Sequence, residues 1–410
     1  MLFRSEQSSR GVATIKALLN LALAVGGLYA PLTGQGNGQG GREHGQKNDQ
    51  LPGYQSIENP AARAYISDLW GISESELPHT GLSAQELLEA CGSPVRGLLV
   101  LGSNPVVSAA NSLRVTRALG ALEHLVVIDC YLSETAQLAD VVLPGNMWLE
   151  EDGTMTNLEG RVLRRRQVMQ PPPGARADWR ILCELSALLG VGEKFAFASP
   201  EEIFTELALA TKGGPADYSG ISYPRLEPDG IFAPCPSIDH PGTPRPFVQS
   251  FAHADGKAHL EPVVYQVLEG ISAAQPIFFT TGRNAHQYQS GTQTRRNAKL
   301  NPRAPHATLE LHPNLAREHG VQAGDAVTVS SGNGTATFEA VLNAGIREDT
   351  VYAPFHYAGA GNANRLTGSS LDPISRMPDF KVTPVTLEPA LTAVPLDSRS
   401  PAKAPLDAPP

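Results

Sequence analysis

The stretch VRGLLVLGSNP, residues 95–105, has the pattern that decides the fold. Its apolar run ends at Gly102, which is typical of a buried strand that reaches a turn. Apolar residues at helical spacing follow over 108–122, and two further apolar runs come next, HLVVIDC (124–130) and ADVVLP (139–144). A strand, a helix and two more strands with continuous apolar runs indicate a parallel sheet covered on both faces. The sequence therefore predicts an α/β, Rossmann-like domain.

Composition limits the class of protein. The 410 residues are enough for two or three domains, and 41% hydrophobic with 18% charged residues is typical of a globular chain. A formal net charge of -9 without a basic block argues against a nucleic-acid partner. The four cysteines lie far apart without a CxxC pair, and the histidines are scattered, so spacing predicts no metal site. Sparse cysteines suit a reducing compartment.

The apolar run 15–32 raises the question of a membrane segment or a signal peptide. It is shorter than the roughly 20 residues that a spanning helix needs, and no clear cleavage pattern follows it. A buried helix is the preferred interpretation. We therefore expect no membrane association and a cytoplasmic location.

The rest of the chain divides by pattern. Helices are predicted at 177–189 and 200–210, and the Pro- and Gly-rich stretch 222–246 is interpreted as a surface connection or linker. A second domain begins near Pro276, with a hairpin signal at Gly332-Asn333-Gly334. Its strands are predicted at 276–281, 307–312, 325–331, 335–342 and 350–355, with one short helix at 313–318. Such closely spaced strands favour a compact β-barrel.

Polar residues follow the first strand of the predicted sheet. A parallel sheet binds ligands beyond the carboxyl ends of its strands, and Gly102, Ser103 and Asn104 lie at such an end. Asp129 closes the next strand, at a distance along the chain that suits an acid reading a ribose or a base. The alternative is a turn whose Ser and Asn cap the following helix. Both interpretations stay open from the residues alone.

The glycine-rich stretch LTGQGNGQGGREHG, residues 32–45, contains a formal GxGxxG match. It follows a predicted helix instead of a strand and opens no evident helix, so the match is interpreted as coincidental. Its polar residues are too varied for a simple spacer. Composition leaves open whether it folds around a polar ligand.

The stretch TGRNAHQYQSGTQTRR, residues 281–296, leaves an apolar strand with hydroxyls, amides, a histidine and three arginines. This set suits an anionic ligand that accepts many hydrogen bonds, and the alternative is a solvated, charged loop. No Ser-His-Asp order, paired-carboxylate site or HExxH motif is evident, so the residues predict no catalytic constellation of their own.

Taken together, several motifs in the same order resemble those of the molybdopterin oxidoreductases that bind a bis(molybdopterin guanine dinucleotide) molybdenum cofactor. The resemblance covers nearly the whole chain up to its proline-rich tail. It rests on the stretches 32–45 and 281–296 quoted above and on GSNPVVS (102–108), ETAQLADVVLPGNMWLEEDGTMTNLEGRV (134–162) and ANRLTGSSLDPISRMPDFK (363–381).

The resemblance implies a Rossmann-like domain followed by a six-stranded double-psi-type β-barrel. It implies domains at 1–35 (the remnant of an upstream cofactor-binding domain), 36–145 (Rossmann-like), 146–272 (connecting), 273–390 (barrel) and 391–410 (disordered tail). The cofactor contacts that it implies are Thr33, Gln35, Ser103, Asn104, Asp129, Asp178, Thr281, Gly282, Arg283, His286, Gln287, Ser290, Thr292, Asn364 and Lys381. Phe355 or His356 would line the substrate funnel.

Two departures from the family pattern affect the expected activity. Neither the cysteine motif for a [4Fe-4S] cluster nor the later metal-ligating residue is found, and Glu151 stands where relatives often carry Lys. The chain thus resembles the C-terminal half of an enzyme, with the cluster expected in a missing N-terminal half, and it is expected to be inactive alone.

The reaction that the resemblance implies is nitrate reduction, with electrons from a donor protein or domain. Thr33-Gly34-Gln35 resembles the assimilatory nitrate reductase branch, whereas formate dehydrogenases tend to place an arginine at position 33. Formate oxidation is the alternative within the family. A stand-alone cofactor-binding protein without turnover is the alternative outside enzymes.

Overall fold

The computed structural model describes residues 7–30, 36–264 and 276–390. The backbone divides into two compact units, and each combines stretches that are far apart in sequence. The first unit contains 1–21, 85–143 and 261–410, and the second contains 22–84 and 144–260. The linear domain boundaries expected from the sequence stay a prediction, and the tail at 391–410 lies outside the described residues.

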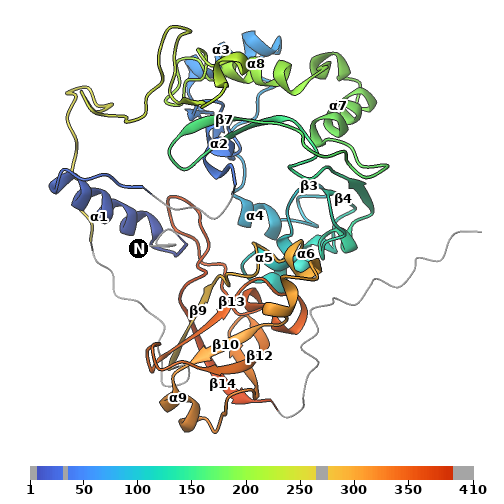
Figure 1. Cartoon of the computed structure of the whole chain (residues 1–410), viewed down its shortest axis with the longest axis vertical. Helices are drawn as coiled ribbons and strands as arrows, with labels where there is room; N and C mark the ends of the chain where they lie inside the picture. The colour runs from blue at the N-terminus through green and yellow to red at the C-terminus, as the bar shows by residue number, and fades with distance from the viewer. Residues whose placement is uncertain (1–6, 31–35, 265–275, 391–410) are drawn as a thin grey trace, which may run out of the picture. The chain divides into compact units, whose positions relative to one another are not determined.

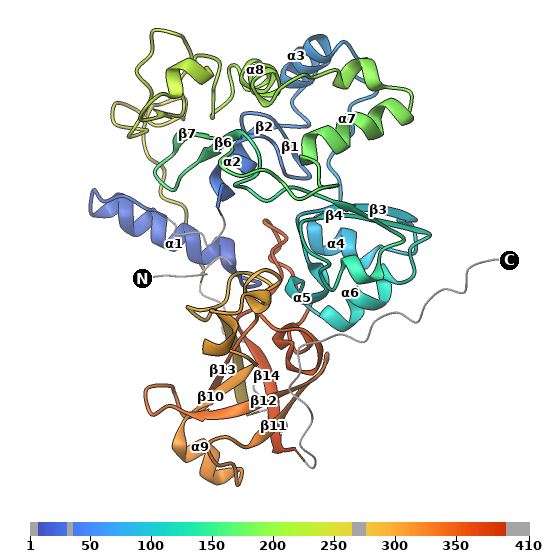
Figure 2. The same cartoon turned by 45° about the vertical axis from the view of Figure 1, so that its right-hand side comes forward.

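The first unit contains the predicted parallel sheet, in the order β3-β4-β5. Its strands are β3 (Gly97–Leu101), β4 (His124–Asp129) and β5 (Val141–Pro144), with β3 and β4 parallel and in register from Gly97↔His124 to Leu101↔Ile128. The helix predicted over 108–122 is α6 (Ser112–Leu119), a short helix α5 (Pro105–Ser108) comes before it, and α4 (Ala84–Glu89) precedes the sheet. Figure 2 shows α4 and α6 beside β3 and β4.

One face of this sheet is better covered than the other. Val100 is buried with Val115 and Leu119 of α6, so burial of apolar area stabilises this side. On the opposite side, Leu99 and Leu101 keep 40% and 43% of their surface exposed. The prediction of full cover on both faces is therefore wrong for the described residues, because they supply no second layer over β3.

The barrel of the first unit is closed and has six strands, in the order β10-β12-β11-β14-β9-β13 (Figure 1). The strands are β9 (Ile277–Gly282), β10 (Thr308–Leu311), β11 (Ala326–Ser331), β12 (Gly334–Leu342), β13 (Thr350–Pro354) and β14 (Thr383–Pro389). The hairpin predicted at Gly332-Asn333-Gly334 is confirmed, since Ser331 pairs with Gly334. The sequence did not indicate β14, which carries two prolines.

Alternating strand residues fill the barrel with apolar side chains. Phe279, Leu309, Val327, Phe338 and Val351 are all fully buried in one core cluster. The helix α9 (Pro313–Glu318) matches the predicted range, and the remaining short helices are η1 (Ala136–Leu138), η4 (Thr294–Arg296), η5 (Asn301–Arg303), η6 (Gly359–Gly361) and η7 (Ala363–Arg365). The α/β class with a Rossmann-like sheet and a six-stranded barrel is thus confirmed.

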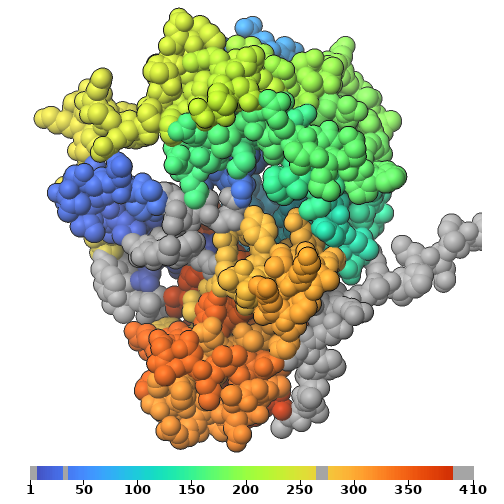
Figure 3. All heavy atoms as spheres, viewed as in Figure 1, coloured from blue at the N-terminus to red at the C-terminus, as the bar shows by residue number. Residues whose placement is uncertain are grey.

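The apolar run near the N-terminus forms the helix α1 (Gly11–Ala24), but this helix is not buried. Gly11 is its only buried residue, whereas Leu19 and Leu21 are 40% and 60% exposed, and much of the helix surface is visible in Figure 3. The prediction of a buried helix is wrong because α1 is apolar on several sides and the described chain covers few of them. Within the described residues, no helix has the length and hydropathy needed to span a bilayer.

The second unit is built from helices and two small sheets. Its elements are α2 (Gly38–Glu43), β1 (Gln50–Leu51), β2 (Gln55–Ser56), α3 (Pro60–Trp70), β6 (Gly153–Thr156), β7 (Arg161–Arg165), α7 (Asp178–Leu188), η2 (Gly192–Phe195), α8 (Pro200–Ala210), η3 (Tyr223–Leu226) and β8 (Ile231–Phe232). The helices predicted at 177–189 and 200–210 are α7 and α8. The hairpin β6–β7 was not predicted.

The Pro- and Gly-rich stretch 222–246 contributes several residues to the interior of this unit, whereas its residues 236–239 are exposed. Tyr223, Leu226 and Cys235 are buried in one cluster with Phe204 and Tyr218. The interpretation as a surface connection is therefore wrong for these buried residues. Prolines set the turns of this stretch, and the apolar residues between them pack inward.

Candidate functional site

The tip of β3 carries the first predicted site residues. Gly102 has φ +58°, a left-handed conformation that glycine adopts readily, and its N–H donates to the Ile128 carbonyl at 2.8 Å. The turn leaves Ser103 exposed and buries Asn104 to 5% exposure. Asp129 ends β4 as predicted, and its Oδ1 accepts from the Tyr131 N–H at 3.4 Å. The side chain of Asn104 does not cap α5.

The loop 283–296 follows β9, and His356 holds its backbone from the barrel side. His356 is fully buried, and its Nδ1 donates to the Gln289 carbonyl at 2.5 Å. Its Nε2 accepts from the Asn284 N–H at 2.8 Å. Because a carbonyl only accepts and an amide N–H only donates, the ring is the neutral tautomer with its proton on Nδ1. The structure therefore gives His356 a role in fixing the loop.

Gln287 fixes the loop from within. It is 5% exposed, its Nε2 donates to the Ala304 carbonyl at 2.9 Å, and its Oε1 accepts from the Thr294 hydroxyl at 2.6 Å. Ser290 and Thr292 bond to each other through their hydroxyls at 2.8 Å. The loop is thus held by its own polar groups, while Tyr288, Gln293 and Arg296 remain exposed.

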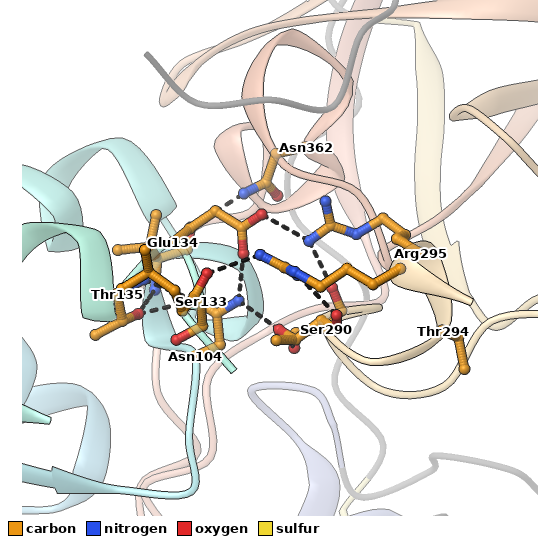
Figure 4. A network of polar contacts seen from close by, with 12 residues as sticks. Asn104, Ser133, Glu134, Thr135, Ser290, Thr294, Arg295 and Asn362 are labelled. Carbon is orange, nitrogen blue, oxygen red and sulfur yellow. Dashed lines mark hydrogen bonds and ion pairs between the residues drawn. The ribbon is translucent and has the colours of Figure 1, made fainter. Parts of the chain in front are cut away.

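A buried network joins this loop to the sheet (Figure 4). Glu134, in the segment after β4, accepts from Arg295 Nη2 at 2.7 Å and from Asn104 Nδ2 at 2.7 Å. The side chains of Arg295 and Glu134 are only 6% and 4% exposed. Asn104 Nδ2 also donates to the Thr292 hydroxyl at 2.9 Å. This buried ion pair, with the hydrogen bonds around it, holds two parts of the first unit together.

Burial alone would raise the pKa of the Glu134 carboxyl, because it disfavours the charged form. The charge and hydrogen bond of Arg295 and the hydrogen bond from Asn104 outweigh burial, so the pKa of Glu134 is lowered from its ordinary value. Glu134 is therefore a carboxylate at neutral pH. The stability that the ionised Glu134 contributes is fully present above the ordinary pKa of a glutamate, and it is lost as pH falls through the lowered pKa of Glu134.

Two asparagines after the barrel strand β13 contact the helix α5 of the sheet. Asn362 Nδ2 donates to the Val106 carbonyl at 3.1 Å, and Asn364 Nδ2 donates to the Val107 carbonyl at 2.8 Å. Asn364 is 1% exposed, and its Oδ1 has no hydrogen-bond partner among the described residues. A buried acceptor without a donor is costly, so this oxygen is a candidate ligand contact.

Lys381 and Thr281 lie together at the end of β9. Lys381 Nζ donates to the Thr281 carbonyl at 2.8 Å and lies 3.0 Å from its hydroxyl, and that hydroxyl donates to the Phe380 carbonyl at 2.8 Å. The next residue is Gly282, where a Cβ would lie 2.0 Å from the Tyr352 ring. Glycine is therefore required where β9 passes Tyr352.

Two arginines in this region are partly desolvated. Arg283 lies 5.8 Å from the Phe355 ring centroid, and Arg365 Nη1 donates to the Gly359 carbonyl at 3.2 Å. Burial lowers the pKa of each guanidinium, and each Nε is buried without a partner among the described residues. Neither has an ion pair with a carboxylate in that part of the chain, so both are candidates for an anionic ligand.

The glycine-rich stretch belongs to the second unit. From residue 36 it is described, and it does begin a helix, α2, so the expectation that it opens none is wrong. Asn37 has φ +59°, its Oδ1 accepts from the Thr156 N–H at 2.9 Å, and a Cβ on Gly40 would lie 2.1 Å from that oxygen. The glycines thus allow a tight turn against β6.

A buried polar group lies under this turn. The Glu43 carboxylate, 4% exposed, accepts from the Tyr218 hydroxyl and from Gln39 Nε2, the latter at 2.7 Å. The His44 ring contacts Tyr218 edge-on with 5.7 Å between centroids. Burial lowers the pKa of His44 to about 4. His44 is therefore neutral near pH 7.

Most predicted site residues come together in the first unit, at the strand tips and in the segments after the barrel strands. These are Ser103, Asn104, Asp129, Thr281, Gly282, Arg283, His286, Gln287, Ser290, Thr292, Phe355, His356, Asn364 and Lys381. Asp178 is in the second unit, in the first turn of α7. Thr33 and Gln35 lie outside the described residues. Their roles in binding stay predictions.

Glu134, Arg295 and Asn362 were not singled out from the sequence. Glu134 is one acid in the stretch 134–144, and only the fold shows that it meets an arginine 161 positions later. A usable signal is that Ser133, Glu134 and Thr135 are three successive polar residues that begin four positions after the end of a buried strand. Glu151, the departure noted above, pairs with Arg165 at 3.0 Å.

The described residues contain no group of three or more His, Cys, Asp or Glu side chains placed to hold a metal ion. The fold belongs to the class of α/β proteins that join a parallel sheet to a closed six-stranded barrel. A solved structure of this class, acetylene hydratase from Pelobacter acetylenicus, aligns with TM-score 0.57 and 18% identity. The alignment covers 80% of this chain and 50% of that one, and it supports the fold alone.

Sequence comparison shows the family. The molybdopterin oxidoreductase profile matches residues 4–188, and the molydopterin dinucleotide binding domain matches 277–384. The assimilatory nitrate reductase catalytic subunit of Bacillus subtilis (strain 168) is 47% identical over 406 residues, 95% of this chain and 57% of that protein. The chain belongs to the molybdopterin oxidoreductase family.

A second relative is the F420-dependent formate dehydrogenase subunit alpha of Methanocaldococcus jannaschii. It is 37% identical over 389 residues, which is 93% of this chain and 56% of that protein. The chain thus spans just over half the length of these relatives. Nitrate reductase and formate dehydrogenase subunits both occur among its relatives.

Proposed function

We propose that the chain is the cofactor-binding part of a cytoplasmic molybdenum oxidoreductase that reduces nitrate to nitrite. The relative at 47% identity, an assimilatory nitrate reductase subunit, supports nitrate as the substrate. The observation that carries the binding role is the buried Asn364 Oδ1, an acceptor without a donor among the described residues, in the unit that gathers the polar strand tips.

The residues of the first unit fit a long, phosphate-bearing ligand such as a molybdopterin guanine dinucleotide. Asn364 Oδ1 would accept from a ligand N–H group, and Arg283 and Arg365 would offer charged donors to phosphate oxygens. Loop 283–296 is held by hydrogen bonds of its own side chains and of His356, and such internal ordering lowers the entropy cost of binding. When bound, the molybdenum group would supply the two electrons that convert nitrate and two protons to nitrite and water.

The remaining parts of the enzyme would lie in the portion of the relatives that this chain does not span. We place the [4Fe-4S] cluster, the protein ligand of molybdenum and the entry point from an electron donor there. The chain alone is therefore expected to reduce no nitrate when reduced viologen is offered as the electron donor. Nitrite formation by the purified chain would contradict this division of roles.

Formate dehydrogenase is the second candidate, because subunits of that enzyme are also relatives. A stand-alone cofactor-binding protein is the third. With the native upstream sequence restored, nitrate-dependent oxidation of viologen supports the first, and formate-dependent dye reduction supports the second. Guanine dinucleotide cofactor bound by the 410-residue chain itself, with neither activity, supports the third.

The role of Asn364 is tested by Asn364→Ala in the enzyme with its upstream sequence restored. Loss of one hydrogen bond to the ligand costs about 1–1.5 kcal/mol, so we expect about tenfold weaker retention of the guanine nucleotide. The nucleotide is quantified by mass spectrometry after acid release, alongside molybdenum.

Asn362→Ala is the matched control. Asn362 makes the same kind of bond to α5, but its Oδ1 is already used by the Asn364 N–H at 2.8 Å. Its cofactor content is expected to stay close to that of the unaltered enzyme. Equal losses in the two variants would remove the support for Asn364 as a ligand contact.

A further inference from the structure

The polar network of the first unit joins three segments that are far apart in sequence. Asn104 lies at the tip of β3, Glu134 and Thr135 follow β4, and Thr292 and Arg295 belong to loop 283–296. In Figure 4, Glu134 lies between Asn104 and Arg295. Each segment contributes at least one side chain that is less than a tenth exposed.

The bonding capacity of Asn104 is fully used inside the protein. Its Nδ2 donates to Glu134 at 2.7 Å and to Thr292 at 2.9 Å. Its Oδ1 accepts from the Thr135 hydroxyl at 2.8 Å and from the Thr135 N–H at 3.2 Å. An amide side chain has two donor hydrogens and two acceptor lone pairs, so none is left for a ligand. This occupancy argues against the direct contact expected from the sequence.

Glu134 has the central place because its two oxygens serve two different partners. One oxygen accepts from Arg295 and the other from Asn104, both at 2.7 Å. Arg295 Nη2 also donates to the Ser290 carbonyl at 3.3 Å, within the same loop. Removing the carboxylate charge would leave the Arg295 guanidinium buried beside a neutral group, which is a strongly unfavourable state.

Arg296 adds a second attachment of the loop to the segment before Glu134. Its Nη2 donates to the Leu132 carbonyl and its Nη1 to the Thr292 carbonyl, each at 2.7 Å. Arg295 and Arg296 therefore both bind loop 283–296 to the segment that follows β4. Attachment at this point fixes Arg295, Thr292 and the backbone between them.

We propose that Glu134 is the positioning residue of loop 283–296, acting through Arg295 and Asn104, and that Asn104 positions this loop instead of contacting the ligand. Glu134 thereby sets where the predicted contacts Ser290 and Thr292 lie relative to the tip of β3. The consequence for cofactor binding rests on the proposed function, whereas the consequence for the loop does not.

The test compares Glu134→Gln with the unaltered 410-residue chain by hydrogen–deuterium exchange. Glutamine keeps the shape and can still accept from Asn104, but it leaves Arg295 without its counter-charge. Amides of 284–296 are expected to exchange about a hundredfold faster, while amides of β11 and β12 keep their rates.

Glu123→Gln is the matched control, because Glu123 also pairs with an arginine, Arg96, in the same unit. Those two side chains are 51% and 74% exposed, so the same chemical change there is expected to leave loop exchange unchanged. Equal acceleration in the loop and in β11 and β12 would indicate general loosening and would overturn the proposal. Unchanged exchange of the loop would overturn it as well.

A double variant, Glu134→Gln with Arg295→Gln, keeps the proposal testable if the single variant does not fold. Removing both charges relieves the unpaired arginine, so the urea midpoint is expected to recover toward that of the unaltered chain. Exchange of 284–296 is expected to stay fast, because the attachment is still missing. Slow exchange in the double variant would show that another contact positions the loop.

In the enzyme with its upstream sequence restored, Glu134→Gln is also expected to lower the guanine nucleotide content. If the unaltered enzyme carries no guanine nucleotide, the proposed function fails, and the exchange measurements still decide the role of Glu134. If the unaltered enzyme carries it and the variant retains all of it despite a mobile loop, the positioning role in binding is overturned.

Discussion

Gly291→Ala is expected to destabilise the first unit by about 3 kcal/mol. Gly291 has φ +72°, a conformation that costs a residue with a Cβ roughly 1–2 kcal/mol. Its Cβ would also lie 2.4 Å from the His356 carbonyl oxygen and 2.8 Å from Arg295 Nε. Since the carbonyl belongs to the backbone, the clash cannot be relieved by a side-chain rotation, and overpacking adds about 1–3 kcal/mol. Urea unfolding of the purified chain measures the loss.

Gly320→Ala separates the cost of the left-handed backbone conformation from the cost of the steric clash. Gly320 has φ +67°, close to that of Gly291, but no atom lies within 4 Å of the Cβ position. It is expected to lose only about 1 kcal/mol, from the backbone conformation. Equal losses for both variants would mean that loop 283–296 moves away freely, against the fixed position that His356 gives it.

His44→Phe is expected to reduce the acid sensitivity of the second unit. Burial lowers the pKa of His44 to about 4 from an ordinary 6.5, so between these values the unfolded chain binds a proton that the folded chain does not. Stability therefore falls as pH drops from 6.5 to 4, by up to about 3 kcal/mol at 1.36 kcal/mol per pH unit. Phenylalanine keeps an aromatic ring against Tyr218 without this titration.

Urea unfolding at pH 7, 5.5 and 4.5 checks this expectation. The difference in unfolding free energy between pH 7 and 4.5 should be smaller for His44→Phe than for the unaltered chain. His124→Phe, at an exposed histidine, is the control and should keep the original pH dependence. The same pH dependence in all three proteins would show that His44 is protonated without cost.

The barrel could be predicted because its strands alternate and because Gly332-Asn333-Gly334 marks a hairpin. The strand β14 was missed because its sequence contains two prolines, which argue against a strand. In the structure these prolines occupy its second and last positions. The many prolines of 222–246 led to the prediction of a surface connection, although residues such as Tyr223 and Leu226 are buried. The local sequence pattern predicts turns well, but it does not indicate which residues between the turns are buried.

The polar strand tips were predicted, and the structure gathers most of them in one unit. The role of each of these residues could not be predicted from the sequence. Asn104 and His356 were expected at ligand and substrate, yet their side chains bond to the Glu134 network and to the backbone of loop 283–296. Such pairings join residues that are 30 to 188 positions apart, so the spacing of residues within a short stretch of sequence does not predict them.

The place of β14 in the barrel sets an order of events during synthesis. This strand pairs with β9 on one side and with β11 on the other, and it is the last of the six barrel strands along the chain. Until residue 389 has emerged, the nascent barrel has two open edges with unpaired backbone groups, which are sites for chaperone capture or association with other chains. The barrel can therefore close only after residue 389 has been made, more than a hundred residues after its first strand, β9, begins.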